Sequence, residues 1–358
     1  MKSLVKTPIR FLTLPGAFIL MATVVGMQDL SAGRPEDGSS NGKEAVREIP
    51  AAEPTAELLV TGLEGGAGST IGPGGALYVT EAHAGRISRV DPRTGEIATF
   101  ASGLPKRMPG FGFGGVVDVA FLGKTAYALV TLVGPDVGGS ATVGIYRVDG
   151  PGQFTVVADI GEFSLSNPPT IPFDFFVPTG VQYALEAYRG GFLVTDGHLN
   201  RVLRVDLDGE ITEWMGFGNI VPTGLTVSGN TVYMAMAGPA PHLPQDGKIV
   251  AIGPKPPTVK QVASGARLLV DVEFGRGRLL YGLSQGVFPL GEPDGTPALP
   301  DTGALVQVND QGGLTVVVDG LDQPTSFEFI GNTAYVVTYG GEIWKIEGIS
   351  DPPYGGSH

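Results

Sequence analysis

The stretch Thr80-Glu81-Ala82-His83-Ala84-Gly85-Arg86-Ile87-Ser88-Arg89-Val90-Asp91 returns further along the chain as Thr195-Asp196-Gly197-His198-Leu199-Asn200-Arg201-Val202-Leu203-Arg204-Val205-Asp206. In both copies a polar turn joins two short apolar strands, and the second strand ends in Arg-Val-Asp. Related segments occur six times in this 358-residue chain. Repeats of this length that contain only short strands are typical of a β-propeller. The sequence therefore predicts an all-β protein, a six-bladed β-propeller.

Each predicted blade has four strands, which we label a to d from the central channel outwards. Three of the inner strands begin with similar steps: Pro178-Thr179-Gly180, Pro222-Thr223-Gly224 and Pro324-Thr325-Ser326. We align the six copies of strand a on one position, occupied by Gly68, Asp118, Gly180, Gly224, Asp271 and Ser326.

The second and third strands of each blade are apolar runs bounded by Gly- and Asp-rich hairpin turns. We predict strand b at 76–80, 125–131, 191–195, 231–236, 278–282 and 333–338. We predict strand c at 86–90, 143–148, 201–205, 248–252, 304–308 and 342–346.

The last blade has no outer strand of its own, because the chain is almost complete after Ile346. The N-terminal run 57–63 matches the outer strand at 314–321 in its apolar pattern. We therefore expect the N-terminal strand to supply the outer strand of the last blade. This arrangement closes the ring and leaves only short, protected sheet edges.

The N-terminus has the features of an export signal. Lys2, Lys6 and Arg10 accompany an apolar stretch from Phe11 to Gly26, and Ser31-Ala32-Gly33 offers small residues for cleavage. The apolar stretch is short for a membrane span, which needs about 20 residues; retention as an N-terminal anchor is the alternative. We expect an exported protein, periplasmic or extracellular, with no membrane span after signal removal.

The domain organisation follows from composition. Residues rich in Pro, Ser, Gly and Glu follow the signal and show no strand or helix period, which is typical of a flexible linker. The expected organisation is a signal peptide at 1–33, a linker at 34–56, the propeller at 57–350 and a flexible tail at 351–358.

Charge and cysteine content narrow the function classes. The chain carries 23 Lys and Arg against 36 Asp and Glu, a formal net charge of −13. So acidic a protein is a poor partner for nucleic acid and anionic lipid. The chain has no cysteine, which excludes disulfides, Cys-based metal sites and a thiol nucleophile.

Extra residues interrupt the repeats at only two kinds of connection. They lie between strands d and a, or between strands b and c, at 108–115, 133–142, 161–177, 238–247 and 286–302. In a propeller these two connections share one face, and loops that elaborate one face of a rigid scaffold usually carry its function. We expect an unknown small molecule or protein to bind on this elaborated face.

Three histidines are candidates for catalysis on the same face. His83 and His198 follow Glu81 and Asp196 by two residues at equivalent b–c turns, and His242 lies in another b–c loop. A histidine beside a carboxylate suggests proton transfer or metal ligation. The alternative is a polar turn inherited with the repeat, since the two equivalent turns belong to blades that are not neighbours.

Two aspartates are candidates for metal binding. Asp118 and Asp271 occupy similar apolar contexts, and they belong to opposite blades of a six-membered ring. An acid within an apolar inner strand must be paired or hydrogen-bonded. They either hold an ion on the channel axis or accept backbone N–H bonds from the neighbouring blade.

Two aromatic segments enter inner strands from the elaborated face, Phe111-Gly112-Phe113-Gly114 and Phe173-Asp174-Phe175-Phe176. They either line an apolar pocket or plug the channel. The Gly-x-Ser-x-Gly match at 282–286 lacks the strand–turn–helix context of a nucleophile elbow, so we assign it no catalytic role.

The blade motifs resemble those of the exported ScyD/ScyE-type propeller family. The resemblance rests on Ala76-Leu77-Tyr78-Val79-Thr80-Glu81, Ile145-Tyr146-Arg147-Val148-Asp149 and the segment at 167–169, and it covers about residues 57–347. It implies an exported six-bladed propeller similar to NHL-repeat propellers, and it brings no defined catalytic residues.

A more distant similarity is to gluconolactonase-type propellers, which are divalent-metal hydrolases whose ligands include residues at the blade entries. Here those entries read Thr179, Thr223, Thr325, Val117 and Val270. Hard cations need several carboxylate or carbonyl oxygens, so the departure counts against a lactonase.

We therefore predict a binding or scaffold module without a cofactor. The alternative is a metal-dependent hydrolase or lyase with a rearranged site, holding a divalent ion such as Ca²⁺.

Overall fold

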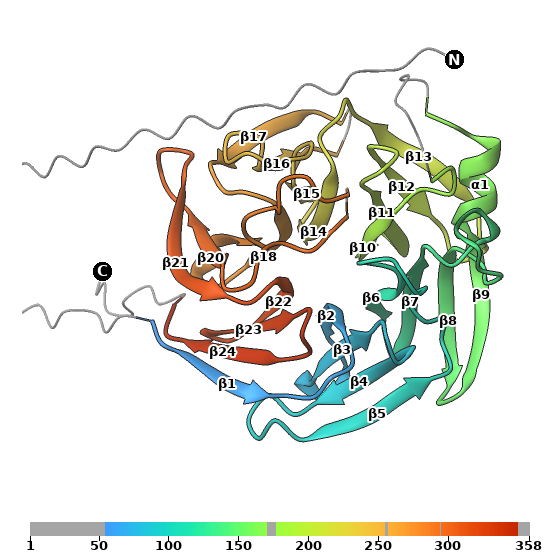
Figure 1. The fold of residues 1–358 in the computed structure, drawn as a ribbon, viewed down its shortest axis with the longest axis horizontal. Coiled ribbons are helices and arrows are strands. Elements are labelled where there is room, and N and C mark those ends of the chain that lie inside the picture. Colours follow the sequence, from blue (N-terminus) through green and yellow to red (C-terminus); the bar gives the residue numbers. More distant parts are fainter. Residues whose placement is uncertain (1–53, 170–176, 255–256, 294, 350–358) are drawn as a thin grey trace, which may run out of the picture. The chain divides into compact units, whose positions relative to one another are not determined.

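The computed structural model describes residues 54–169, 177–254, 257–293 and 295–349. These residues form six four-stranded antiparallel sheets arranged around a central channel, which confirms the six-bladed propeller (Figure 1). The predicted signal peptide, most of the predicted linker, Phe173 to Phe176 and the C-terminal tail with His358 lie outside the described residues. No helix in the described part of the chain is long and apolar enough to cross a bilayer.

The first three blades follow one another along the chain. Blade 1 contains β2 (Gly66–Ile71), β3 (Leu77–Glu81), β4 (Arg86–Val90) and β5 (Ile97–Ser102). Blade 2 contains β6 (Gly115–Leu122), β7 (Thr125–Thr131), β8 (Gly144–Gly150) and β9 (Gln153–Asp159). Blade 3 contains β10 (Gln182–Tyr188), β11 (Gly191–Asp196), β12 (Arg201–Val205) and β13 (Ile211–Gly216).

The other three blades complete the ring. Blade 4 contains β14 (Pro222–Ser228), β15 (Thr231–Met236), β16 (Lys248–Ile252) and β17 (Val259–Ser264). Blade 5 contains β18 (Leu269–Phe274), β19 (Leu280–Ser284), β20 (Gly303–Val308) and β21 (Leu314–Leu321). Blade 6 contains β22 (Pro324–Ile330), β23 (Thr333–Thr338), β24 (Ile343–Glu347) and β1 (Ala56–Val60).

The ring closes through β1, as the sequence predicted. β1 pairs antiparallel with β24, with Ala56 opposite Ile346 and Leu58 opposite Trp344. The innermost strand of blade 6 also contacts the innermost strand of blade 1. The first and last described strands therefore share one sheet, so separating the two ends of the propeller requires breaking a strand pair.

The core lies between the blades. Leu129, Ile145, Phe192 and Leu203 are fully buried in one apolar cluster, which joins blade 2 to blade 3. Because side chains alternate across a strand, each sheet offers an apolar face to both neighbours. Such packing stabilises the propeller without disulfides.

The described residues contain one α-helix, α1 (Ile160–Ser166), which lies between β9 and β10 and was not expected from the sequence. The Asp159 side chain accepts a hydrogen bond from the Glu162 backbone N–H at 2.8 Å and caps the helix. Three short 3₁₀ turns complete the described secondary structure, at Pro73–Gly75, Pro135–Val137 and Arg276–Arg278.

The predicted alignment of strand a is wrong in blade 3. Ala184, rather than Gly180, occupies the aligned position. In blade 6 the residue after the aligned Ser326 donates its N–H to the aspartate of the preceding blade, Asp271. In blade 3 the residue that donates in this way, to Asp118, is Leu185, so the aligned residue is the one before it. Gly180 instead lies in the turn before β10, at a φ of +79° that favours glycine. The Pro-Thr-Gly step that guided the alignment is therefore a turn in this blade.

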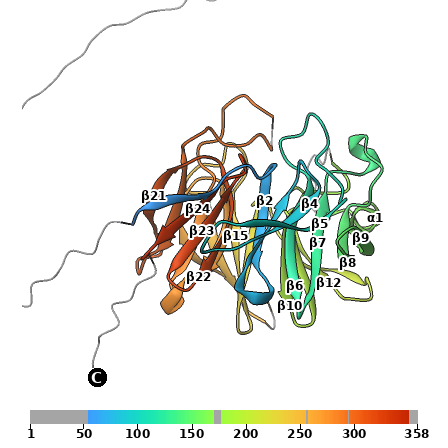
Figure 2. The ribbon, with the colours of Figure 1, turned by 90° about the horizontal axis from the view of Figure 1, so that it is seen from below.

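The long connections lie on one face, as predicted. In Figure 2 the loop before β6, the loop after β19 and α1 rise above the sheets at the upper side. The a–b and c–d hairpins at the other face are short.

Candidate functional site: the central channel

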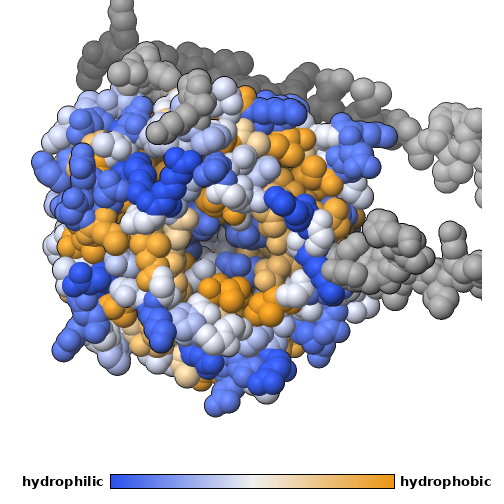
Figure 3. All heavy atoms as spheres, turned by 180° about the vertical axis from the view of Figure 1, so that it is seen from behind, coloured by the Kyte–Doolittle hydropathy of each residue, from blue (hydrophilic) through white to orange (hydrophobic). Residues whose placement is uncertain are grey.

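The channel contains a cavity of about 760 Å³. Inner-strand residues of all six blades line it, and loops of the elaborated face form its mouth. Seen from behind Figure 1, the molecule is also hollowed at its centre, with apolar side chains around the hollow (Figure 3). Cavities that bind small molecules commonly have volumes of about 300 to 1,000 Å³.

The predicted metal candidates, Asp118 and Asp271, both line this cavity and make the same contacts. One oxygen of Asp118 accepts from its neighbour Val119 N–H at 2.8 Å, and the other accepts from Leu185 N–H of blade 3 at 2.7 Å. Asp271 accepts equivalent bonds from Val272 and from Phe327 of blade 6, at 2.8 and 3.0 Å. Each aspartate therefore fastens its own inner strand to the next blade.

Glycine makes room for each aspartate in the preceding blade. A Cβ at Gly68 would lie 2.2 Å from an Asp118 carboxylate oxygen, and one at Gly224 would lie 2.4 Å from Asp271. Both distances are far shorter than contact, so any larger residue would displace the aspartate. The Gly and Asp of successive blades thus form one structural device, which is used twice in the ring.

A second set of acids lies two residues further along the inner strands. Glu186, Glu273 and Glu328 occupy the same register, each opposite a residue of strand b: Leu193, Tyr281 and Tyr335 respectively. Two residues along a strand correspond to about 7 Å. All three side chains line the cavity, and all three were missed by the sequence analysis.

Among the described residues, these glutamates have no Lys or Arg partner. The Glu273 carboxylate accepts a hydrogen bond from Thr226 Oγ1 at 3.0 Å, but no described Lys or Arg forms an ion pair with any of the three. The described lining of the cavity contains five carboxylates and no Lys or Arg.

This crowding changes the protonation of the channel. Burial, and then the charge of Asp271, raise the pKa of Glu186 to about 8. Burial raises the pKa of Asp271 to about 7. Burial, followed by the charges of neighbouring acids, holds the pKa of Glu273 and of Glu328 well above the ordinary range. At neutral pH the channel therefore retains protons that isolated carboxyl groups would lose.

Aromatic side chains surround the mouth. Phe113 stacks on Tyr183 with ring centroids 4.8 Å apart and an angle of 21° between the rings. Phe111 and Tyr339 also line the cavity. Arg107 Nη1 donates hydrogen bonds to the Phe111 carbonyl and to the Tyr339 hydroxyl. Phe111 and Phe113 thus line the pocket, one of the two roles considered for this loop.

The carboxylate of Glu81 is fully buried and is held in place by hydrogen bonds within blade 1 and its entry loop. It accepts hydrogen bonds from Arg86 Nε at 2.7 Å and Nη2 at 2.6 Å, from Ser88 and from the Glu64 backbone N–H. Burial raises its pKa, but the bonds from Arg86 and Ser88 outweigh burial and leave the pKa below its ordinary value. The His83 ring lies edge-on to the Tyr339 ring, with the ring centroids 5.7 Å apart. His83 is not among the described residues that line the cavity.

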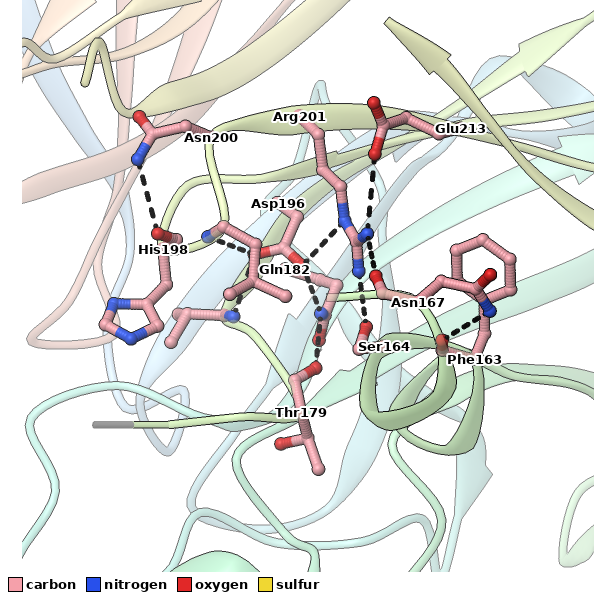
Figure 4. Close-up of polar contacts among 12 residues, drawn as sticks. Phe163, Ser164, Asn167, Thr179, Gln182, Asp196, His198, Asn200, Arg201 and Glu213 are labelled. Carbon is pink, nitrogen blue, oxygen red and sulfur yellow. Dashed lines mark hydrogen bonds and ion pairs between the residues drawn. The ribbon is translucent and has the colours of Figure 1, made fainter. Parts of the chain in front are cut away.

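Asp196 and Arg201 occupy the equivalent positions in blade 3, but no hydrogen bond joins them (Figure 4). Asp196 Oδ1 accepts from Val181 N–H at 3.1 Å, and Oδ2 accepts from Gln182 Nε2 at 3.1 Å. Arg201 Nε lies 3.9 Å from the same Oδ2. Arg201 is only 1% exposed. It donates to Ser164 Oγ of α1 at 2.9 Å and to the Asn167 carbonyl at 2.7 Å. Arg201 therefore anchors the helical insertion to blade 3.

The other two candidate histidines do line the cavity. His198 Nε2 accepts from Val177 N–H at 3.3 Å. His242 Nδ1 donates to the Gly238 carbonyl at 2.7 Å and packs edge-on against Phe288 at 5.3 Å. The structure thus brings His198, His242, Asp118 and Asp271 to one cavity, and it places His83, Glu81 and Asp196 outside its described lining.

The residues present do not fit the divalent-metal centre of gluconolactonase-type propellers. Both carboxylate oxygens of each aspartate accept a hydrogen bond from a backbone N–H group. The residues before the aligned position are Ala67, Val117, Thr223, Val270, Thr325 and, after the correction in blade 3, Tyr183 instead of Thr179. Among the described residues, no three His, Asp or Glu side chains are arranged to hold a metal ion.

Comparisons with known proteins identify the architecture. No family model matches the sequence, and no curated protein matches it. A gluconolactonase from Xanthomonas campestris superposes with a TM-score of 0.57 at 12% identity, covering 83% of this chain and 90% of that one. A PQQ-bound aldose sugar dehydrogenase from Streptomyces coelicolor superposes at 0.53 and 15% identity, covering 83% and 99%. A luciferin-regenerating enzyme superposes at 0.54 and 12% identity, covering 83% and 96%. At such identities the likeness shows the fold alone.

Proposed function

We propose that this chain is an exported propeller of the ScyD/ScyE kind that binds a small organic molecule in its channel cavity. The observation that carries the proposal is the cavity itself, which all six blades line and whose mouth the elaborated loops build. Export is supported by the basic residues and apolar stretch at the N-terminus. A binding role also accounts for loops that are long on one face only.

A variant that fills the cavity tests this function. Thr70 lies in the inner strand of blade 1, opposite Tyr78, at the register that the channel glutamates occupy in other blades. Thr70→Trp places an indole ring in the cavity. Thr99→Trp puts the same side chain on the exposed outer strand of that blade and serves as the matched control.

The measurement is saturation-transfer NMR with a mixed set of small aromatic molecules that carry positive, zero or negative charge. We expect at least one class to bind the wild-type protein and the Thr99→Trp variant, and to lose binding in Thr70→Trp, with both variants folded by circular dichroism. Wild-type protein that binds none of the set, or a Thr70→Trp variant that binds equally well, overturns the proposal.

A further inference from the structure

The cavity has two chemically different zones. Its depth is lined by the carboxyl groups of Glu186, Glu273 and Glu328, and its mouth by the rings of Phe111, Phe113, Tyr183 and Tyr339. The two zones lie in one continuous cavity of about 760 Å³. One ligand can therefore contact both.

The deep zone of the cavity holds acidic side chains without a described Lys or Arg beside them. Elsewhere in the protein, buried acids on strand b are matched by an arginine, as Glu81 is by Arg86 at 2.6 Å. The channel glutamates have no such match among the described residues, although each lies within the field of other channel acids. An ammonium group brought by a ligand would favour the ionised form of these acids and attract it, an effect that a low-dielectric channel strengthens.

The mouth favours an apolar or aromatic body. Phe113 and Tyr183 present a stacked pair of rings, and Val177 and Leu132 extend the apolar surface in the same cluster. Aromatic rings attract both other rings and organic cations. A bare metal ion would leave this surface unused, and the aspartate oxygens that might coordinate it are already bonded to backbone N–H groups.

We propose that the cavity binds an organic amine with an apolar or aromatic body, its ammonium group among Glu186, Glu273 and Glu328 and its body at the aromatic mouth. This inference rests on the proposed small-molecule-binding function and adds the chemical class of the ligand. Charge complementarity selects the amine over neutral and anionic analogues of the same shape.

Three probes of one shape test the inference by isothermal titration calorimetry: phenylbutylamine, phenylbutanol and phenylbutyrate. We expect the amine to bind the wild-type protein about tenfold or more tightly than the alcohol, and phenylbutyrate not to bind. Glu328→Gln should weaken the amine about tenfold and leave the alcohol unchanged. Glu96→Gln, which alters an exposed glutamate of blade 1, should change neither affinity.

The outcomes separate this inference from the function on which it rests. Equal affinities for the amine and the alcohol, or an amine affinity that Glu328→Gln does not change, overturn the ligand class. If none of the three probes binds, but other molecules bind and are lost in Thr70→Trp, the ligand class falls and the binding function stands. If no molecule of any class binds, both fall.

Discussion

The buried acids that end strand b in blades 1 and 3 have an arginine beside them, and the acids of the channel have none among the described residues. Glu81 and Asp196 end strand b at equivalent positions; Arg86 hydrogen-bonds to Glu81, and Arg201 Nε lies 3.9 Å from Asp196. Glu186 and Glu328 lie in the channel without a described Lys or Arg partner. A buried carboxylate with its own arginine contributes to the architecture. A set of carboxylates that lacks one is costly to the fold, and a ligand that supplies the charge would offset this cost.

The largest effect should come from removing the arginine of a turn. Arg201→Met leaves Asp196 buried without the nearby positive charge, and it removes the hydrogen bonds to Ser164 of α1 and to the carbonyl of Asn167, which follows the helix. We expect the free energy of unfolding to fall by about 3 to 5 kcal/mol, measured by urea denaturation. Arg93→Met, at an arginine whose side chain is 86% exposed, is the control and should change it by less than about 0.5 kcal/mol. A similar small change in Arg201→Met would contradict the structural role of this pair.

Removing an acid from the channel should have a smaller effect of opposite sign. The pKa of Glu186 is raised from 4.5 to about 8, so the folded state holds its proton more tightly than the unfolded state. Its contribution to stability is complete below pH 4.5 and is lost as the pH rises through about 8. Glu186→Gln should therefore weaken the fall in stability across this range and make the protein more stable than wild type at pH 9, by about 1 kcal/mol.

Urea denaturation between pH 5 and pH 9 measures this dependence. Glu96→Gln is the matched control, because Glu96 is exposed on blade 1 and should leave the wild-type slope unchanged. A Glu186→Gln variant that keeps the full wild-type slope would show that this glutamate does not titrate in the range predicted.

The repeat made the blades predictable because strand b pairs with strand c without a bulge in all six blades. Predicted strands at 125–131, 231–236, 201–205 and 248–252 coincide with β7, β15, β12 and β16. Strand a was harder, since its pairing with strand b is bulged in all six blades and the bulge breaks the two-residue period. In blade 3 the sequence therefore predicts strand a at Pro178-Thr179-Gly180, where the structure has the turn before β10.

The site was predictable only in part. The apolar contexts of Asp118 and Asp271 pointed to hydrogen bonds from the neighbouring blade, and the structure shows them. The channel glutamates carried a signal that was overlooked, an acid between two apolar residues at one register of three inner strands, as in Leu185-Glu186-Ala187. Their convergence depends on ring closure, which sequence spacing alone does not convey. The α1 helix had a signal too, the capping pair Asp159 and Glu162, but it spans only 7 residues.

The most direct test compares the titration of Glu81 with that of Glu186 by carbon-detected NMR on protein labelled at glutamate, with assignments from Glu81→Gln and Glu186→Gln. The pKa of Glu81 should lie below 4.5, because Arg86 and Ser88 donate to its carboxylate, and the pKa of Glu186 should be about 8. A Glu186 that titrates near 4.5, as an ordinary glutamate does, would show that its charge is already balanced and would contradict the account of the channel.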